Sequence, residues 1–112
     1  MRIIVAALAV ALAGPAFAHS KAEVSTPSDG ATVEAVPEIG MSFDKPMRIV
    51  SILLTREGEA VRLEERTGMA MTTDFTAAPA DALAPGDYEV EWRGMSEDGH
   101  PMQGGFGFTV SP

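Results

Sequence analysis

The chain has 112 residues and a net charge of −8, with 16 acidic side chains against 8 basic ones. This balance argues against nucleic acid or an anionic lipid surface as a partner, and it is compatible with the binding of cations, including metal ions. Because there is no cysteine, disulfides, thiol redox chemistry and thiolate metal sites are excluded, so any metal must use nitrogen, carboxylate or thioether ligands.

The N-terminus has the pattern of a secretory signal peptide. Met1-Arg2 is a short basic start, residues 3–14 are almost entirely aliphatic, and residues 15–18 end in the small-x-small pattern that signal peptidase cleaves. We therefore predict a signal peptide over residues 1–18. The remaining residues 19–112 are enough for one domain and too few for two. Cleavage would make His19 the first residue of the mature protein.

The first half of the mature chain predicts short strands and no helix. Residues 38–43 alternate apolar and polar side chains, and residues 48–55 form a β-branched and aliphatic run. Glu57-Gly58-Glu59 is a turn signal, and alternation resumes at residues 60–63, which predicts a hairpin. Residues 71–76 are a weaker strand candidate.

The second half continues this pattern. Residues 79–86 are linker-like and end in a turn, residues 88–92 alternate cleanly, and residues 106–110 alternate again. Short strands at this spacing predict a small antiparallel Greek-key β-sandwich, although a small open barrel would have the same pattern. Two facing layers would bury the aromatic side chains of Phe43, Trp92, Phe106 and Phe108.

The two histidines of the chain are the candidate metal ligands. A free N-terminal His19 offers its amine and its imidazole to the same ion, and the amine loses its proton at modest cost because its reference pKa is roughly 7.7–8.0. In an extended segment, Asp98 and His100 would project to one face, with Gly99 between them. Three nitrogens and one oxygen form a set that favours Cu(II).

Simpler interpretations exist for each of these residues. Asp98-Gly99-His100 is also a turn sequence with a surface histidine, and His19 could merely follow a cleavage site. Glu97 either orients His100 or faces water. Because the chain has only two histidines, one at the new terminus and one beside an acid, a metal site is as well supported as these alternatives.

The methionines suggest a second kind of ligand. Met47, Met69 and Met71 could gather as thioethers for Cu(I), whereas Met41 alternates with core positions. No third histidine is available to help them. We therefore expect the methionines to fill the core, and we do not predict a Cu(I) site.

Two distant blocks of the sequence carry a recognisable pattern. They consist of residues 19–24, 26–31 and 39–47 in the first block, and residues 86–92, Ser96, 98–101, Gly104 and 106–110 in the second. In this order, the two blocks resemble CopC-type copper-resistance proteins. The match covers nearly the whole mature chain and is weakest over residues 57–84.

The resemblance implies an immunoglobulin-like or cupredoxin-like β-sandwich in the periplasm that binds and carries copper. It places the Cu(II) site of that family on His19, Asp98 and His100, with the His19 amine as a further donor. It also implies an inner-membrane partner of the CopD type. We expect a monomer that is not an enzyme.

A different function remains open at this point. Histidine-brace enzymes such as lytic polysaccharide monooxygenases also use an N-terminal histidine and a second histidine on a β-sandwich. The small size of the chain, the lack of an aromatic-rich flat surface and the position of Asp98 argue against that class. A purely structural module is a third possibility, and it predicts no copper binding.

Overall fold

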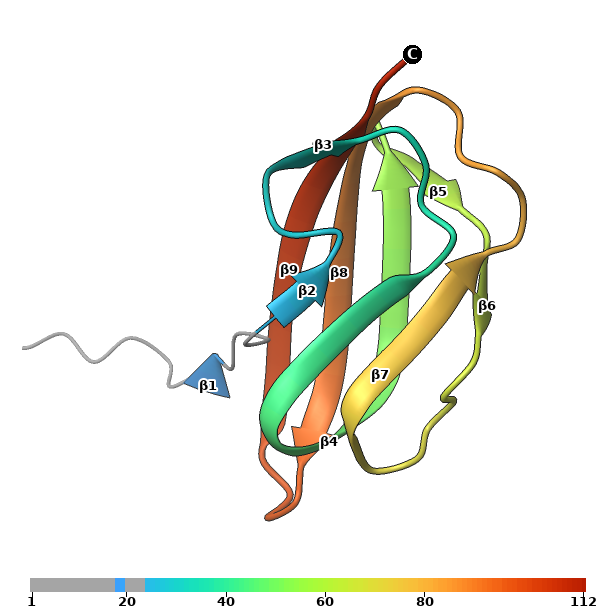
Figure 1. Ribbon diagram of the computed structural model, residues 1–112. Coiled ribbons are helices and arrows are strands. Elements are labelled where there is room, and N and C mark those ends of the chain that lie inside the picture. Colours follow the sequence, from blue (N-terminus) through green and yellow to red (C-terminus); the bar gives the residue numbers. More distant parts are fainter. Residues whose placement is uncertain (1–17, 20–23) are drawn as a thin grey trace, which may run out of the picture.

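The computed structural model describes residues 18–19 and 24–112, and in them all regular structure is β-strand (Figure 1). The strands are β1 (Ala18–His19), β2 (Val24–Thr26), β3 (Ala31–Val33), β4 (Ile39–Arg56), β5 (Glu59–Val61), β6 (Leu63–Glu65), β7 (Thr72–Pro79), β8 (Gly86–Ser96) and β9 (Pro101–Val110). Nowhere in this described part does a helix have the length and hydropathy to cross a membrane. The predicted signal peptide lies outside the described residues, apart from Ala18.

The long strand β4 belongs to both layers of the fold. Its first part pairs with β2 and β7, and its second part pairs with β5 and β8. The register against β7 shifts between Ser42 and Met47, across the sequence Asp-Lys-Pro at residues 44–46. Proline cannot donate to a sheet ladder and is typical of such irregularities. The strands predicted at 38–43 and 48–55 are therefore one bent strand (Figure 1).

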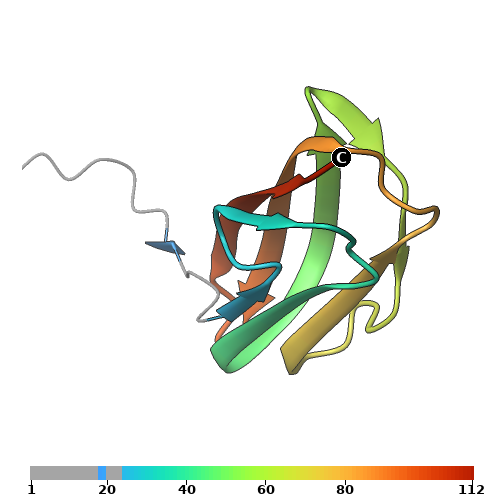
Figure 2. The ribbon, with the colours of Figure 1, turned by 45° about the horizontal axis from the view of Figure 1, so that its top comes forward.

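The bend of β4 produces a small β-sandwich, as predicted. One layer contains β6, β7, the start of β4 and β2, and the other contains the end of β4 with β5, β8 and β9. Figure 2 shows the two layers facing each other. Most pairs are antiparallel, whereas the short strands β1 and β3 run parallel to β9. These parallel pairs are an addition to the predicted antiparallel pattern.

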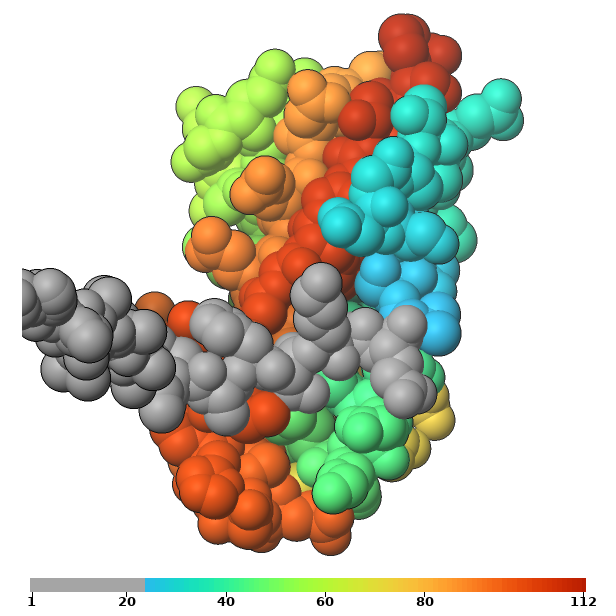
Figure 3. Space-filling model, turned by 90° about the vertical axis from the view of Figure 1, so that its left-hand side faces the viewer, coloured from blue at the N-terminus to red at the C-terminus, as the bar shows by residue number. Residues whose placement is uncertain are grey.

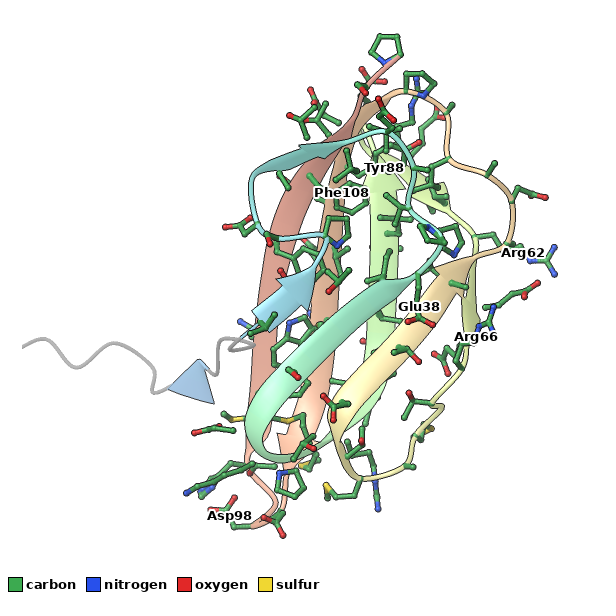
Figure 4. The ribbon with its side chains drawn as sticks, in the orientation of Figure 1. Glu38, Arg62, Arg66, Tyr88, Asp98 and Phe108 are labelled. Carbon is green, nitrogen blue, oxygen red and sulfur yellow. The ribbon has the colours of Figure 1, made fainter. Side chains whose placement is uncertain are left out.

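The core between the layers contains the aromatic residues expected there. Phe43 and Trp92 meet edge to face, with ring centroids 5.2 Å apart. Tyr88 and Phe108 are stacked with centroids 5.3 Å apart, and both are labelled in Figure 4. Phe106 is also buried. Contacts of this kind stabilise a core beyond the area that they bury, which matters in a small domain without disulfides.

The predicted hairpin after β4 is confirmed. Arg56 pairs with Glu59, and the two residues between them, Glu57 and Gly58, have φ angles of 50° and 87°. Positive φ at both central residues is typical of a two-residue type I′ turn, whose twist matches that of the flanking strands.

Candidate metal centre

The turn between β8 and β9 carries two of the three predicted metal ligands. The amide of Ser96 donates to the carbonyl of His100 at 3.0 Å, and the amide of Gly99 donates to the carbonyl of Ser96 at 3.0 Å. Gly99 has a φ of 85°, which a residue without a side chain adopts at little cost. The segment is therefore a tight turn rather than the extended strand considered from the sequence. Figure 4 labels Asp98 at this end of the sandwich.

The turn brings the carboxylate and the imidazole together. Nδ1 of His100 lies 2.8 Å from Oδ2 of Asp98. The hydroxyl of Ser96 donates to Oδ1 of Asp98, and Oγ of Ser96 accepts from the amide of His100 at 3.1 Å. No other hydrogen bond of the His100 ring occurs in the described part of the chain, so Nε2 remains available to an ion. Histidines that bind metals commonly donate their second ring nitrogen to a carboxylate in this way.

The electrostatics of the turn favour a charged carboxylate. The pKa of Asp98 is lowered, mainly because the Ser96 hydroxyl donates to it, and the hydrogen bond and charge of His100 act in the same direction. The side chains of Asp98 and His100 are 69% and 68% exposed. An ionised, accessible carboxylate beside an imidazole is suited to a metal cation.

His19 reaches the same end of the sandwich through β1. Ala18 and His19 pair in parallel with Met102 and Gln103 of β9 (Figure 1). Gln103 lies three residues after His100, which is about 10 Å along a strand. The side chain of His19 lies outside the described residues, and the described part of the chain contains no cluster of three acidic or histidine side chains that could hold an ion. The structure thus brings Asp98 and His100 together and places only the backbone of His19 nearby.

The candidate thioether ligands do not share one environment. Met47 is buried, as is Met41, which confirms the expectation that these residues fill the core. Met69 and Met71 are 59% and 39% exposed, so the expectation that the methionines fill the core is wrong for these two residues.

Ser96 is a site residue that the sequence interpretation did not identify. From the sequence it stands only among the residues that resemble the CopC family, whereas its hydroxyl joins Asp98 to the backbone of His100. A serine two residues before an aspartate at a turn was the available signal. Glu97, considered as a partner of His100, is exposed and makes no side-chain hydrogen bond among the described residues. Asp98 holds the position next to the ring instead.

Comparison with known proteins gives a consistent result. The profile of the CopC domain family matches residues 22–111. Copper resistance protein C of Xanthomonas campestris pv. juglandis is 33% identical over 109 residues, covering 85% of this chain and 82% of that protein. Copper resistance protein C of Escherichia coli is 25% identical over 123 residues, covering 96% of this chain and 94% of that protein.

Solved structures are similar over the same region. The crystal structure of PcoC, described as a methionine-rich copper resistance protein from Escherichia coli, has a TM-score of 0.69 and 27% identity, covering 84% of this chain and 100% of that one. The crystal structure of CopC from Methylosinus trichosporium OB3b has a TM-score of 0.70 and 26% identity, covering 84% and 95%. With the family profile spanning most of the chain, the protein belongs to the CopC domain family.

Proposed function

We propose that the mature protein is a copper carrier of the periplasm that binds Cu(II) through His19, Asp98 and His100, and that it serves copper resistance or copper delivery. The observation that carries this proposal is the 2.8 Å pairing of Asp98 with His100 on an exposed turn, at the end of the sandwich that β1 also reaches. The relatives named copper resistance protein C support it.

The ligand chemistry favours Cu(II). Once Ala18 is removed, His19 supplies an amine and an imidazole, and His100 supplies a second imidazole. Asp98 supplies an oxygen when its hydrogen bond to Nδ1 of His100 is replaced by a bond to the ion. Such a nitrogen and oxygen set is typical of tetragonal Cu(II), which also heads the affinity order of divalent first-row metals. The negative charge of Asp98 favours the doubly charged ion over Cu(I). The proposed Cu(II) site therefore needs no methionine.

The processing of the chain determines when the site becomes complete. The amine of His19 exists only after cleavage at Ala18, so the ligand set is assembled after export. The protein would then work as a monomer beside an inner-membrane partner of the CopD type, as the resemblance to the family implies.

The proposal is tested by titrating the mature protein with Cu(II) against a competing chelator. We expect both His100→Ala and Asp98→Ala, each of which removes a ligand, to weaken binding by more than the roughly 10–100-fold typical of losing an orienting partner. The loss of His100 should cost more, because imidazole suits copper better than a carboxylate does. Glu97→Gln is the matched control, because Glu97 is an exposed neighbour and its substitution changes the net charge by the same amount as Asp98→Ala. Unchanged affinity in both His100→Ala and Asp98→Ala would rule out this site.

A carrier and a histidine-brace enzyme differ in their response to reduction. We expect the copper-loaded carrier to release little peroxide when ascorbate and oxygen are added, because four protein ligands leave no position reserved for substrate. Rapid peroxide production, or cleavage of a polysaccharide, would identify an enzyme. The measurement is a peroxide assay with free Cu(II) at the same concentration as the control.

A further inference from the structure

A groove crosses the outer face of the layer formed by β4, β8 and β9. Its volume is about 730 Å³, and it extends from Gln103 to Gly107 along β9 and from Glu89 to Arg93 along β8. Figure 3 shows this face, where side chains of β8 (orange) project further than the neighbouring surface of β9 (red). The groove is separate from the Asp98–His100 turn, and the proposed copper site does not use it.

The floor of the groove is formed by glycines. Gly105 and Gly107 occupy positions of β9 that lie opposite Glu91 and Glu89 of β8. A Cβ at Gly105 would come within 2.7 Å of the carbonyl oxygen of Val90. On the β9 side the glutamates therefore face bare backbone instead of a cross-strand side chain, whereas on the β4 side Leu53 and Thr55 lie opposite them.

The walls of the groove are acidic. Glu89 and Glu91 stand on β8, and Asp29 lies on the other side of Gly107, whose amide donates to Asp29 Oδ1 at 2.9 Å. Across the described part of the chain, ion pairs occur only between Arg56 and Glu57 and between Asp98 and His100. Among the described residues, these three carboxylates therefore form no ion pair.

The spacing of the charges indicates the shape of the occupant. Glu89 and Glu91 are two residues apart on one face of a strand, which separates them by roughly 7 Å. Basic side chains at alternate positions of an extended peptide have the same spacing. We propose that the groove is a docking surface for a basic, extended segment of a partner protein, with its positive charges over Glu89, Glu91 and Asp29. The exposed side chain of Leu53 supplies an apolar contact.

The charges also orient the partner. Arg93 and Gln103 close the end of the groove toward β1, because Gln103 pairs with Arg93 on one side and with His19 on the other. The basic part of the partner would therefore lie away from β1, and its uncharged end would lie beside His19. The inference that the partner reaches the metal rests on the proposed copper site. The inference that the partner docks in the groove does not depend on that site. A second copy of this chain is disfavoured as occupant by the net charge of −8.

The test is an NMR titration of the ¹⁵N-labelled, metal-free mature protein with an acetylated and amidated octapeptide of alternating lysine and threonine. At about 10 mM ionic strength, where the Debye length is about 30 Å, we expect amide shifts concentrated at residues 89–93 and 103–107. Because the protein is metal-free, the result is independent of the copper titration. Absence of binding, or shifts centred on β6 and β7, would overturn the proposal.

A pair of isosteric variants separates specific docking from general attraction. Glu89→Gln/Glu91→Gln should raise the Kd for the peptide about five-fold, as expected from losing two exposed ion pairs. Glu64→Gln/Glu65→Gln on β6 makes the same change in net charge on exposed residues of the other layer and should leave the Kd nearly unchanged. Equal effects of the two variants would overturn the proposal. It would also fail if a glutamate–threonine octapeptide gave the same shifts, or if the groove amides shifted with protein concentration alone.

Discussion

The contact between Gly104 and Trp92 leads to a quantitative prediction for Gly104→Ala. Gly104 lies opposite Trp92, and a Cβ added there would come 2.8 Å from Cζ2 and 2.9 Å from Cε2 of the indole. Carbon atoms in contact normally lie about 3.5–4.0 Å apart. The indole cannot yield easily because it is 2% exposed and meets the edge of Phe43. Such overpacking typically costs about 1–3 kcal/mol.

The measurement is thermal and urea unfolding, followed by circular dichroism and by the fluorescence of the single tryptophan. For a domain of this size, 1 kcal/mol corresponds to a fall in Tm of about 4–8 °C. Gly40→Ala is the matched control, because a Cβ there meets its nearest atoms at an ordinary 3.8 Å. The lower chain entropy of alanine in the unfolded state should make that variant neutral or stabilised by about 0.4–1 kcal/mol. If the two variants unfold alike, the packing account of Trp92 is wrong.

Three further predictions concern the core, the turn and the metal. Leu54→Ala, at a position with 0% exposure, should lower the free energy of unfolding by about 2–5 kcal/mol in urea, and a loss below 1 kcal/mol would contradict the described core. Ser96→Ala should weaken Cu(II) binding less than His100→Ala does and leave the circular dichroism spectrum unchanged, because the substitution frees Asp98 without removing a ligand. An affinity equal to that of the unmodified protein would show that the turn does not need the hydroxyl. Free Cu(II) at 100 times its Kd should stabilise the mature protein by about 2.7 kcal/mol, which is measured as a rise in Tm that EDTA reverses. An unchanged Tm would mean that the folded state does not bind the ion.

Local pattern was sufficient for the parts of the fold that depend on local rules. Alternation places Trp92 in the core because neighbouring side chains of a strand point to opposite faces. The Glu57-Gly58 turn was predictable because few residue types accept positive φ. The bend of β4 was not predictable from local pattern. The two halves of this strand lie in different layers only because different strands pair with each half. The same holds for β3, whose pairing with β9 joins residues far apart in the sequence.

The candidate site was predictable in composition and less so in geometry. From the sequence, Asp98-Gly99-His100 is either a surface turn or a ligand pair. In the structure the turn is what brings the carboxylate to the imidazole, so the two are compatible. The contribution of Ser96 depends on the hydrogen bonds of the turn, which spacing alone does not reveal. The acidic groove depends on the register that sets Glu89 and Glu91 opposite glycines, and only the paired strands show that register.

The requirement for a free amine at His19 is the central claim of the copper proposal. The most direct test compares Cu(II) affinity and the electron paramagnetic resonance spectrum of the mature protein with those of a variant carrying one extra alanine before His19. The proposal predicts that the extension weakens binding strongly and changes the nitrogen hyperfine pattern, because the amine becomes an amide. Equal affinity and identical spectra would contradict it.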